Sequence, residues 1–170
     1  KEFTYAYRPQ EPGTYMYHCH VEDVEHVQMG MTGMVFVRPA LDVTTGTKHA
    51  YNDAATEFDR EFVMLLTEIW ANSHWADAHI QLPEWSDYKP EFYQINGRSY
   101  PDTILPNGLG TDPTTGDLIP PAGHPELQYQ PMNALVTANA GERVLLRIIN
   151  LGFEHQAMRL SGAKMQVVGK

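Results

Sequence analysis

The alternation of apolar and polar positions along the chain predicts a series of short β-strands. Residues 1–7 alternate so that Phe3, Tyr5 and Tyr7 share one face of an extended segment. Residues 61–70 have an apolar centre that fits a short helix or a buried strand, and their β-like surroundings favour a strand. The other predicted strands cover residues 14–19, 32–37, 92–95, 134–138, 144–150, 157–160 and 164–168.

Segments rich in polar residues, glycine and proline separate the predicted strands. Residues 20–32 are expected to form a loop with an acidic section, and residues 71–91 and 101–131 are expected to form longer loops. Asn96-Gly97 is a hairpin-type turn signal directly after a predicted strand. Residues 41–60 have the composition of a linker.

This order of segments predicts an all-β chain with two incomplete units. The first unit is residues 1–40, the linker is residues 41–60, and the second unit is residues 61–170. The chain opens on a predicted strand without a methionine or leader and stops as another strand ends. We therefore expect it to be a piece of a longer protein.

The composition excludes some classes of function. The formal net charge of −9 argues against a nucleic-acid partner, because phosphate binding needs clustered Lys and Arg. It leaves room for cationic donors or metal ions near the surface. No apolar run approaches the ~20 residues that a membrane span needs. The single cysteine, Cys19, has no internal disulfide partner, so it is buried and inert, reactive, or a metal ligand.

Residues 19–31 bring together the ligand types that suit a redox-active copper ion. Such an ion needs a soft thiolate, imidazoles and a weak axial thioether. Cys19 supplies the thiolate, His26 one imidazole and Met31 the axial sulfur, and Gly30 allows close approach of the backbone. The second imidazole must come from elsewhere, since no histidine precedes His18.

The neighbours of Cys19 point to a second metal centre. On a strand, residues i−1 and i+1 face the side opposite to residue i. If Cys19 binds one copper, His18 and His20 therefore point together to the other side, where they can bind another metal. The two centres are then linked through a few covalent bonds.

The sequence of residues 18–31 resembles the His-Cys-His-x(n)-His-x₃-Gly-Met pattern of multicopper oxidases such as laccases, and residues 11–17 look like the strand that precedes it in that family. The resemblance implies a cupredoxin-like Greek-key β-sandwich. It implies a type 1 copper on Cys19, His26 and Met31, and it makes His18 and His20 ligands of the type 3 coppers in a trinuclear cluster.

The resemblance also implies a function. Cys19, His18 and His20 would be the catalytic residues of a copper-dependent oxidoreductase that oxidises a donor, a phenol or a metal ion, one electron at a time. Dioxygen would be reduced to water at the trinuclear cluster. Such an enzyme would be periplasmic or extracellular. It would need a further domain or subunit to complete the cluster, so we expect residues 1–170 alone to be inactive.

One feature departs from the family pattern. In laccases the third histidine usually lies five residues after the cysteine, whereas His26 lies seven after Cys19. The longer loop resembles two-domain laccases and nitrite reductases. Nitrite reductases lack the second histidine of the triplet, so His20 favours an oxidase.

Residues 61–170 look like the first part of a second cupredoxin domain, through segments 93–101 and 140–150. In copper-bearing domains the next strand carries histidine ligands. Here Arg159, Ser161 and Ala163 occupy those positions and do not bind copper. This unit therefore resembles the copper-free middle domain of three-domain enzymes.

Other interpretations of the same residues remain open. The His-Cys-His segment also fits a buried cysteine with two surface histidines, a zinc site, or a type 1 copper used only for electron transfer. Met29 could compete with Met31 for copper. Glu22, Asp23 and Glu25 fit a solvated acidic loop, or groups that attract cationic donors or relay protons. His49, His124 and His155 are isolated and are expected to be structural or exposed. His74 and His79 are expected to be solvated loop residues, and a metal-binding pair is the alternative.

Overall fold

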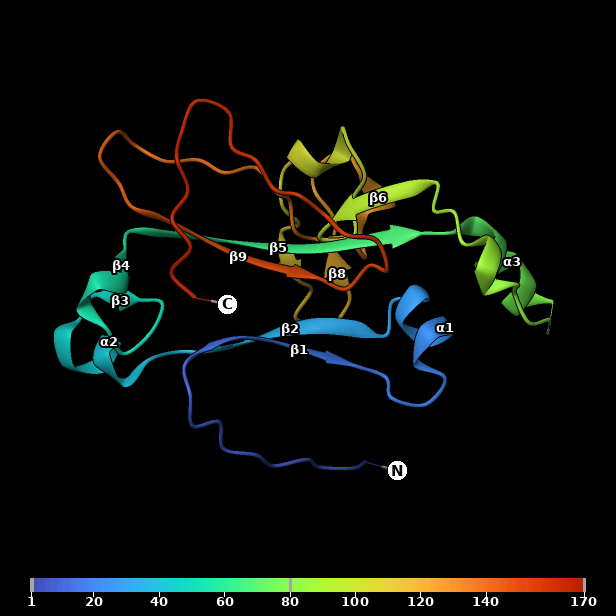
Figure 1. Cartoon of the computed structure of the whole chain (residues 1–170), viewed down its shortest axis with the longest axis horizontal. Coiled ribbons are helices and arrows are strands. Elements are labelled where there is room, and N and C mark those ends of the chain that lie inside the picture. The colour runs from blue at the N-terminus through green and yellow to red at the C-terminus, as the bar shows by residue number, and fades with distance from the viewer. Residues whose placement is uncertain (1, 80, 170) are drawn as a thin grey trace.

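The computed structural model describes residues 2–79 and 81–169, so Lys1, Ile80 and Lys170 lie outside it. The fold is rich in β-structure and has few helices. Figure 1 shows a two-stranded hairpin lying along one side of a three-stranded sheet. Among the described residues, no helix has both the length and the apolar character that a membrane crossing requires.

The hairpin is formed by β1 (Gly13–His18) and β2 (Thr32–Val37). The two strands are antiparallel, with Gly13 opposite Val37 and His18 opposite Thr32. The segment between them contains α1 (Asp23–Gln28), so the hairpin holds the helix at one end. All the candidate metal ligands lie at this end.

The three-stranded sheet has β5 (Arg60–Ile69) at its centre. It pairs in parallel with β9 (Val144–Asn150) and antiparallel with β6 (Phe92–Ile95). Along β5, Met64, Leu66 and Glu68 are buried at every second position, as expected when one strand face lies against the interior. Glu68 is the polar member of this buried row.

Short elements complete the structure. The helices are α2 (Ala40–Thr45) and α3 (Ala71–Ala78), and single 3-10 turns cover Ala54–Thr56, Trp85–Asp87, Asp102–Ile104 and Pro125–Leu127. The remaining strands form two small pairs: β3 (Lys48–His49) with β4 (Glu57–Phe58), and β7 (Gly110–Thr111) with β8 (Leu118–Ile119).

Polar side chains join the hairpin to the sheet. The guanidinium of Arg147, on β9, donates to the hydroxyl of Thr14 at 2.8 Å and to the carboxylate of Glu61, and it lies over the Phe36 ring, 5.4 Å from the centroid. Arg38 donates twice to Glu61 at 2.6 Å. Burial alone would raise the pKa of Glu61, but hydrogen bonds and charge from both arginines hold it below its ordinary value.

Most of the longer predicted strands are confirmed. The strand preference for residues 61–70 is correct, residues 144–150 form β9 as predicted, and Asn96 and Gly97 both have positive φ in the turn after β6. The prediction of an all-β chain is therefore confirmed in its coarser form, since the fold is β-rich but also contains helices.

Four predicted strands are absent from the described residues. These are residues 1–7, of which Lys1 is not described, and residues 134–138, 157–160 and 164–168. Residues 2–11 are exposed and have no neighbouring strand in the described part of the chain. An alternating segment becomes a strand only where another strand satisfies its backbone hydrogen bonds.

The predicted loops and the linker contain helices. The 20–32 loop contains α1, the 71–91 loop contains α3, and most of α2 falls within the 41–60 linker. These helices have six to eight residues. They are thus too short to show the periodicity that identifies a helix in a sequence.

Candidate metal centre

The thiol of Cys19 and the imidazole of His26 face each other at the end of the hairpin. Cys19 directly follows β1, and its backbone N–H donates to the Met31 carbonyl at 3.1 Å, which extends the β1–β2 ladder by one bond. His26 lies in the middle of α1. Its Nδ1 atom is 3.1 Å from Cys19 Sγ. The chain between residues 19 and 26 therefore folds back and brings the soft thiol ligand and the borderline imidazole ligand together.

The contact changes the proton affinity of both groups. Hydrogen bonding with the backbone of Val21, followed by the bond to His26, lowers the pKa of the Cys19 thiol. The hydrogen bond between Cys19 and His26 is the largest influence on His26 and raises its pKa. Desolvation opposes this effect, and the charges of Cys19 and Glu22 raise the pKa further. The contact thus favours the thiolate, which is the form of Cys19 that binds metal, whereas His26 must release its proton to act as a ligand.

The spacing of the pair fits a bound metal ion. With metal–sulfur and metal–nitrogen bonds of about 2.3 and 2.0 Å and a tetrahedral angle, the two ligand atoms lie on the order of 3.5 Å apart. The observed 3.1 Å requires only a small opening to admit the ion. Thiolate with imidazole is also the donor set that copper accepts in both oxidation states.

The backbone of Met31 is fixed near this pair. Its N–H donates to the His26 carbonyl at 2.9 Å, and Gly30 before it adopts φ of 89°, a conformation that favours glycine. Both methionine side chains are about half exposed, 54% for Met31 and 43% for Met29. The backbone thus places Met31 beside the ligand pair.

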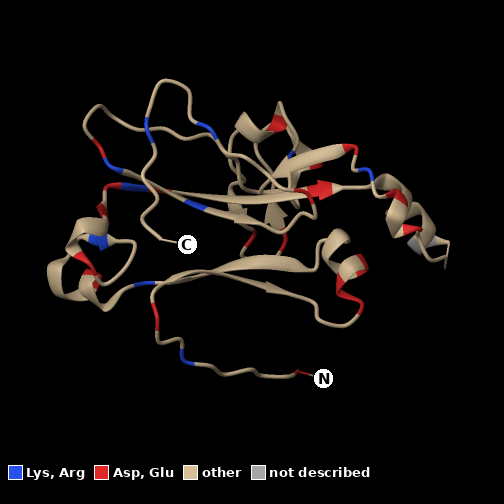
Figure 2. Cartoon of the chain, viewed as in Figure 1, with Lys and Arg blue, Asp and Glu red and all other residues tan. Residues whose placement is uncertain are grey.

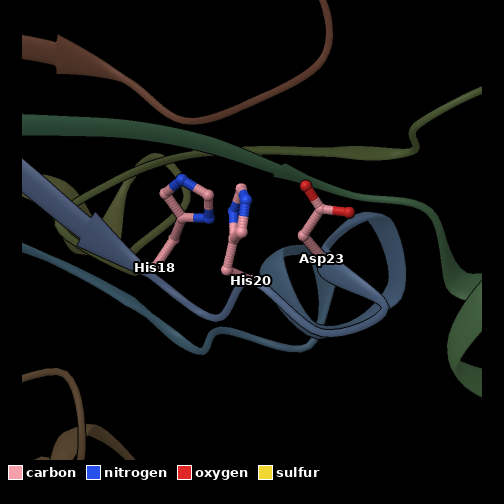
Figure 3. Close-up of side chains that lie close together, drawn as sticks. All are labelled: His18, His20 and Asp23. Carbon is pink, nitrogen blue, oxygen red and sulfur yellow. The ribbon is translucent and has the colours of Figure 1, made fainter.

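A second group of possible ligands lies next to the first. The ligand atoms of His18, His20 and Asp23 all fall within 4.8 Å of one another (Figure 3). The two imidazole rings have centroids 5.7 Å apart and an interplanar angle of 60°. His18 Nδ1 lies 2.7 Å from the Cys19 carbonyl, which only accepts, so Nδ1 carries the proton and Nε2 keeps a free lone pair for a metal.

Asp23 is the member of this group that the sequence did not predict as a metal ligand. It is the first residue of α1, and the chain reaches it through Glu22, a non-glycine residue with φ of 54°. This left-handed residue turns the helix back toward the two histidines. In Figure 2 the acidic residues of this segment colour the ribbon red at the hairpin end, and Glu22 and Asp23 are exposed there. Only the three-residue spacing from His20 could have suggested the contact.

The five predicted ligands thus fall into two adjacent groups. Cys19 and His26, with the backbone of Met31, form one group, and His18 and His20 form the other with Asp23. Cys19 in the first group lies between His18 and His20 of the second group in the chain, so the backbone of residues 18–20 connects the two groups.

The other described histidines for which contacts are known interact with their own neighbours. His49 is buried and lies 3.1 Å from an Asp42 oxygen, and His124 lies 3.0 Å from Glu126. His79 stacks on Trp75, and its Nδ1 donates to the Trp75 carbonyl at 2.7 Å. The contacts of His49 and His124 fit the structural roles expected for isolated histidines.

Comparison with known proteins supports the copper interpretation for the first part of the chain. Residues 1–41 match the family model described as multicopper oxidase. No curated protein and no solved structure matches the chain significantly. The matched residues 1–41 contain both ligand groups.

Proposed function

We propose that the chain is part of a laccase-like multicopper oxidase. In this proposal Cys19, His26 and Met31 bind a type 1 copper, and His18 and His20 bind two type 3 coppers of a trinuclear cluster. The observation that supports it best is the division of the donors into two adjacent groups, which the backbone of residues 18–20 connects. The multicopper oxidase match over residues 1–41 points the same way.

The architecture proposed for the whole chain follows from this function. Residues 1–40 would be the C-terminal part of a cupredoxin-like Greek-key β-sandwich, and residues 61–170 would begin a second, copper-free one. The remaining histidines of both copper sites would come from outside residues 1–170, in another domain or another subunit. A periplasmic or extracellular location is part of the same proposal.

The side chains have distinct tasks in this scheme. Bound copper supplies one-electron oxidation of a phenol or metal-ion donor and reduction of dioxygen to water. The backbone of residues 18–20 joins the Cys19 thiolate to both imidazoles, and the His18–Cys19 hydrogen bond adds a second connection at 2.7 Å. Asp23 places a carboxylate beside the two imidazoles.

Copper counting on the full-length protein tests the proposal. We expect about four copper ions per chain and oxygen consumption with a phenol donor. A His20→Ala variant should lose the trinuclear copper and oxygen consumption while it keeps the type 1 copper. A single copper per wild-type chain without oxygen consumption would instead indicate an electron-transfer protein or a nitrite-reductase-like protein.

A further inference from the structure

Gln28, the last residue of α1, connects the helix that carries His26 to the second unit. It is the buried residue of this helix, with 7% of its surface exposed. Its amide oxygen accepts from the Trp70 backbone N–H at 2.9 Å, and its amide nitrogen donates to the Tyr88 hydroxyl at 3.3 Å. Because a backbone N–H only donates, the orientation of the Gln28 amide is fixed.

The hydrogen bonds continue from Tyr88 into the sheet. The Tyr88 hydroxyl donates to Glu68 at 2.8 Å, and the same Glu68 oxygen accepts from the backbone N–H groups of Phe153 and Glu154. Burial, followed by the hydrogen bond and charge of Glu68, raises the pKa of Tyr88. The hydroxyl therefore keeps its proton and remains a donor at physiological pH.

Aromatic packing makes this anchor rigid. The Tyr88 ring lies 5.6 Å from the Trp70 ring and 5.4 Å from the Phe153 ring, centroid to centroid. Edge-to-face and tilted contacts of this kind are favourable beyond the area that they bury. Gly152 leaves room for the Glu68 carboxylate, because a Cβ there would collide with it.

We propose that Gln28 is a positioning residue for the proposed type 1 copper, and that the second unit holds it through Tyr88 and Glu68. Gln28 lies between His26 and Met31 in the chain, and the Met31 N–H donates to the His26 carbonyl. Release of Gln28 therefore loosens His26 relative to Cys19, while the Cys19 N–H bond to the Met31 carbonyl keeps Cys19 and Met31 together at the end of the hairpin. The copper ion in this inference rests on the proposed function, whereas the hydrogen bonds are those of the described residues.

Hydrogen–deuterium exchange on the metal-free full-length protein tests the mechanical part. Gln28→Met keeps the side-chain size but removes both hydrogen bonds, and Tyr88→Phe removes the hydroxyl but keeps the ring. We expect exchange in residues 22–31 to become faster on the order of tenfold in both variants. Tyr93→Phe is the matched control, since the Tyr93 hydroxyl donates to Glu154 at 2.8 Å and not to Gln28 or Glu68; it should leave this exchange unchanged.

Spectroscopy of the copper-loaded full-length protein tests the positioning part. Gln28→Met and Tyr88→Phe should shift the thiolate-to-copper absorption and the copper reduction potential at unchanged copper content, and Tyr93→Phe should not. Faster exchange with an unchanged absorption spectrum and an unchanged reduction potential would show that Gln28 has a structural role only, and this would overturn the inference. Unchanged exchange in both variants would also overturn it. If Gln28→Met does not fold, Tyr88→Phe decides by the same criteria. A wild-type protein that binds no copper contradicts the proposed function and removes the copper-positioning role with it, while the exchange result still decides whether Gln28 holds α1.

Discussion

Cys19 Sγ and His26 Nδ1 lie 3.1 Å apart, although the two residues are seven positions apart in the chain. The β1–β2 hairpin fixes the thiol, and α1 carries the imidazole back to it. This contact gives the metal-free chain a chemical property of its own, because it favours the charged form of each partner.

The contact predicts how the reactivity of Cys19 depends on pH. Since the pKa of Cys19 is lowered, the thiolate persists to lower pH than in an ordinary cysteine. In metal-free protein, the pH midpoint of alkylation by iodoacetamide should therefore lie below that of a free thiol, and His26→Ala should move it upward. His20→Ala is the matched control and should leave it in place. Equal midpoints in wild type and His26→Ala would contradict the contact.

The second ligand group predicts a role for Asp23 in metal affinity. Its carboxylate lies within 4.8 Å of the ligand atoms of His18 and His20. In a calorimetric titration of metal-free Cys19→Ser protein with Zn²⁺, the substitution Asp23→Asn should weaken binding by about tenfold, the scale seen when groups around a metal are removed. Glu25→Gln, on the same helix but outside the group, should bind as tightly as its parent. Equal affinity in the Asp23 variant would exclude its carboxylate from the site.

The interface between hairpin and sheet predicts acid sensitivity. The pKa of Glu61 in the folded protein lies below the ordinary pKa of a glutamate. The ion pairs of Glu61 therefore contribute fully to stability at pH values above the ordinary pKa, and this contribution is lost as the pH falls through the folded-state pKa. Urea unfolding of wild type should therefore show a loss of stability in this acidic range, and Glu61→Gln should reduce that loss. A parallel pH dependence in the two proteins would show that Glu61 is not the group responsible.

Removal of the Glu61 side chain predicts a large loss of stability at neutral pH. Glu61→Ala leaves Arg147, whose side chain is 3% exposed, without its carboxylate. Breaking a buried ion pair in this way costs about 3 kcal/mol in the free energy of unfolding, measured by urea titration. Glu142→Ala, which breaks the more exposed pair with Arg60, is the matched control and should cost clearly less. Similar losses in the two variants would contradict the special role of the buried pair.

Local patterns in the sequence predicted the strands that define the sheet and hairpin. The apolar run that forms β9 and the turn at Asn96-Gly97 are properties of neighbouring residues, so they are visible in the sequence. The alternating segment with Phe3, Tyr5 and Tyr7 has an equally clear pattern, yet it forms no strand. Its outcome depends on a neighbour to pair with, which a local pattern does not reveal.

The candidate site shows the same limit. The residue types and spacing of Cys19 and His26 were sufficient to predict a ligand pair. The helix α1 was not predicted, and neither was the position of Asp23 beside the histidines. The bond between Gln28 and Trp70 joins residues 42 apart in the chain. Only the three-dimensional fold brings such residues together.

The absorption spectrum of the copper-loaded full-length protein tests the central claim most directly. A copper ion bound by the Cys19 thiolate predicts an intense blue band from thiolate-to-copper charge transfer. Cys19→Ser should abolish the band and the oxidation of the donor, whereas Met29→Leu should retain both. A Cys19→Ser protein that keeps its colour and its oxidase activity would contradict the claim that this cysteine holds the copper.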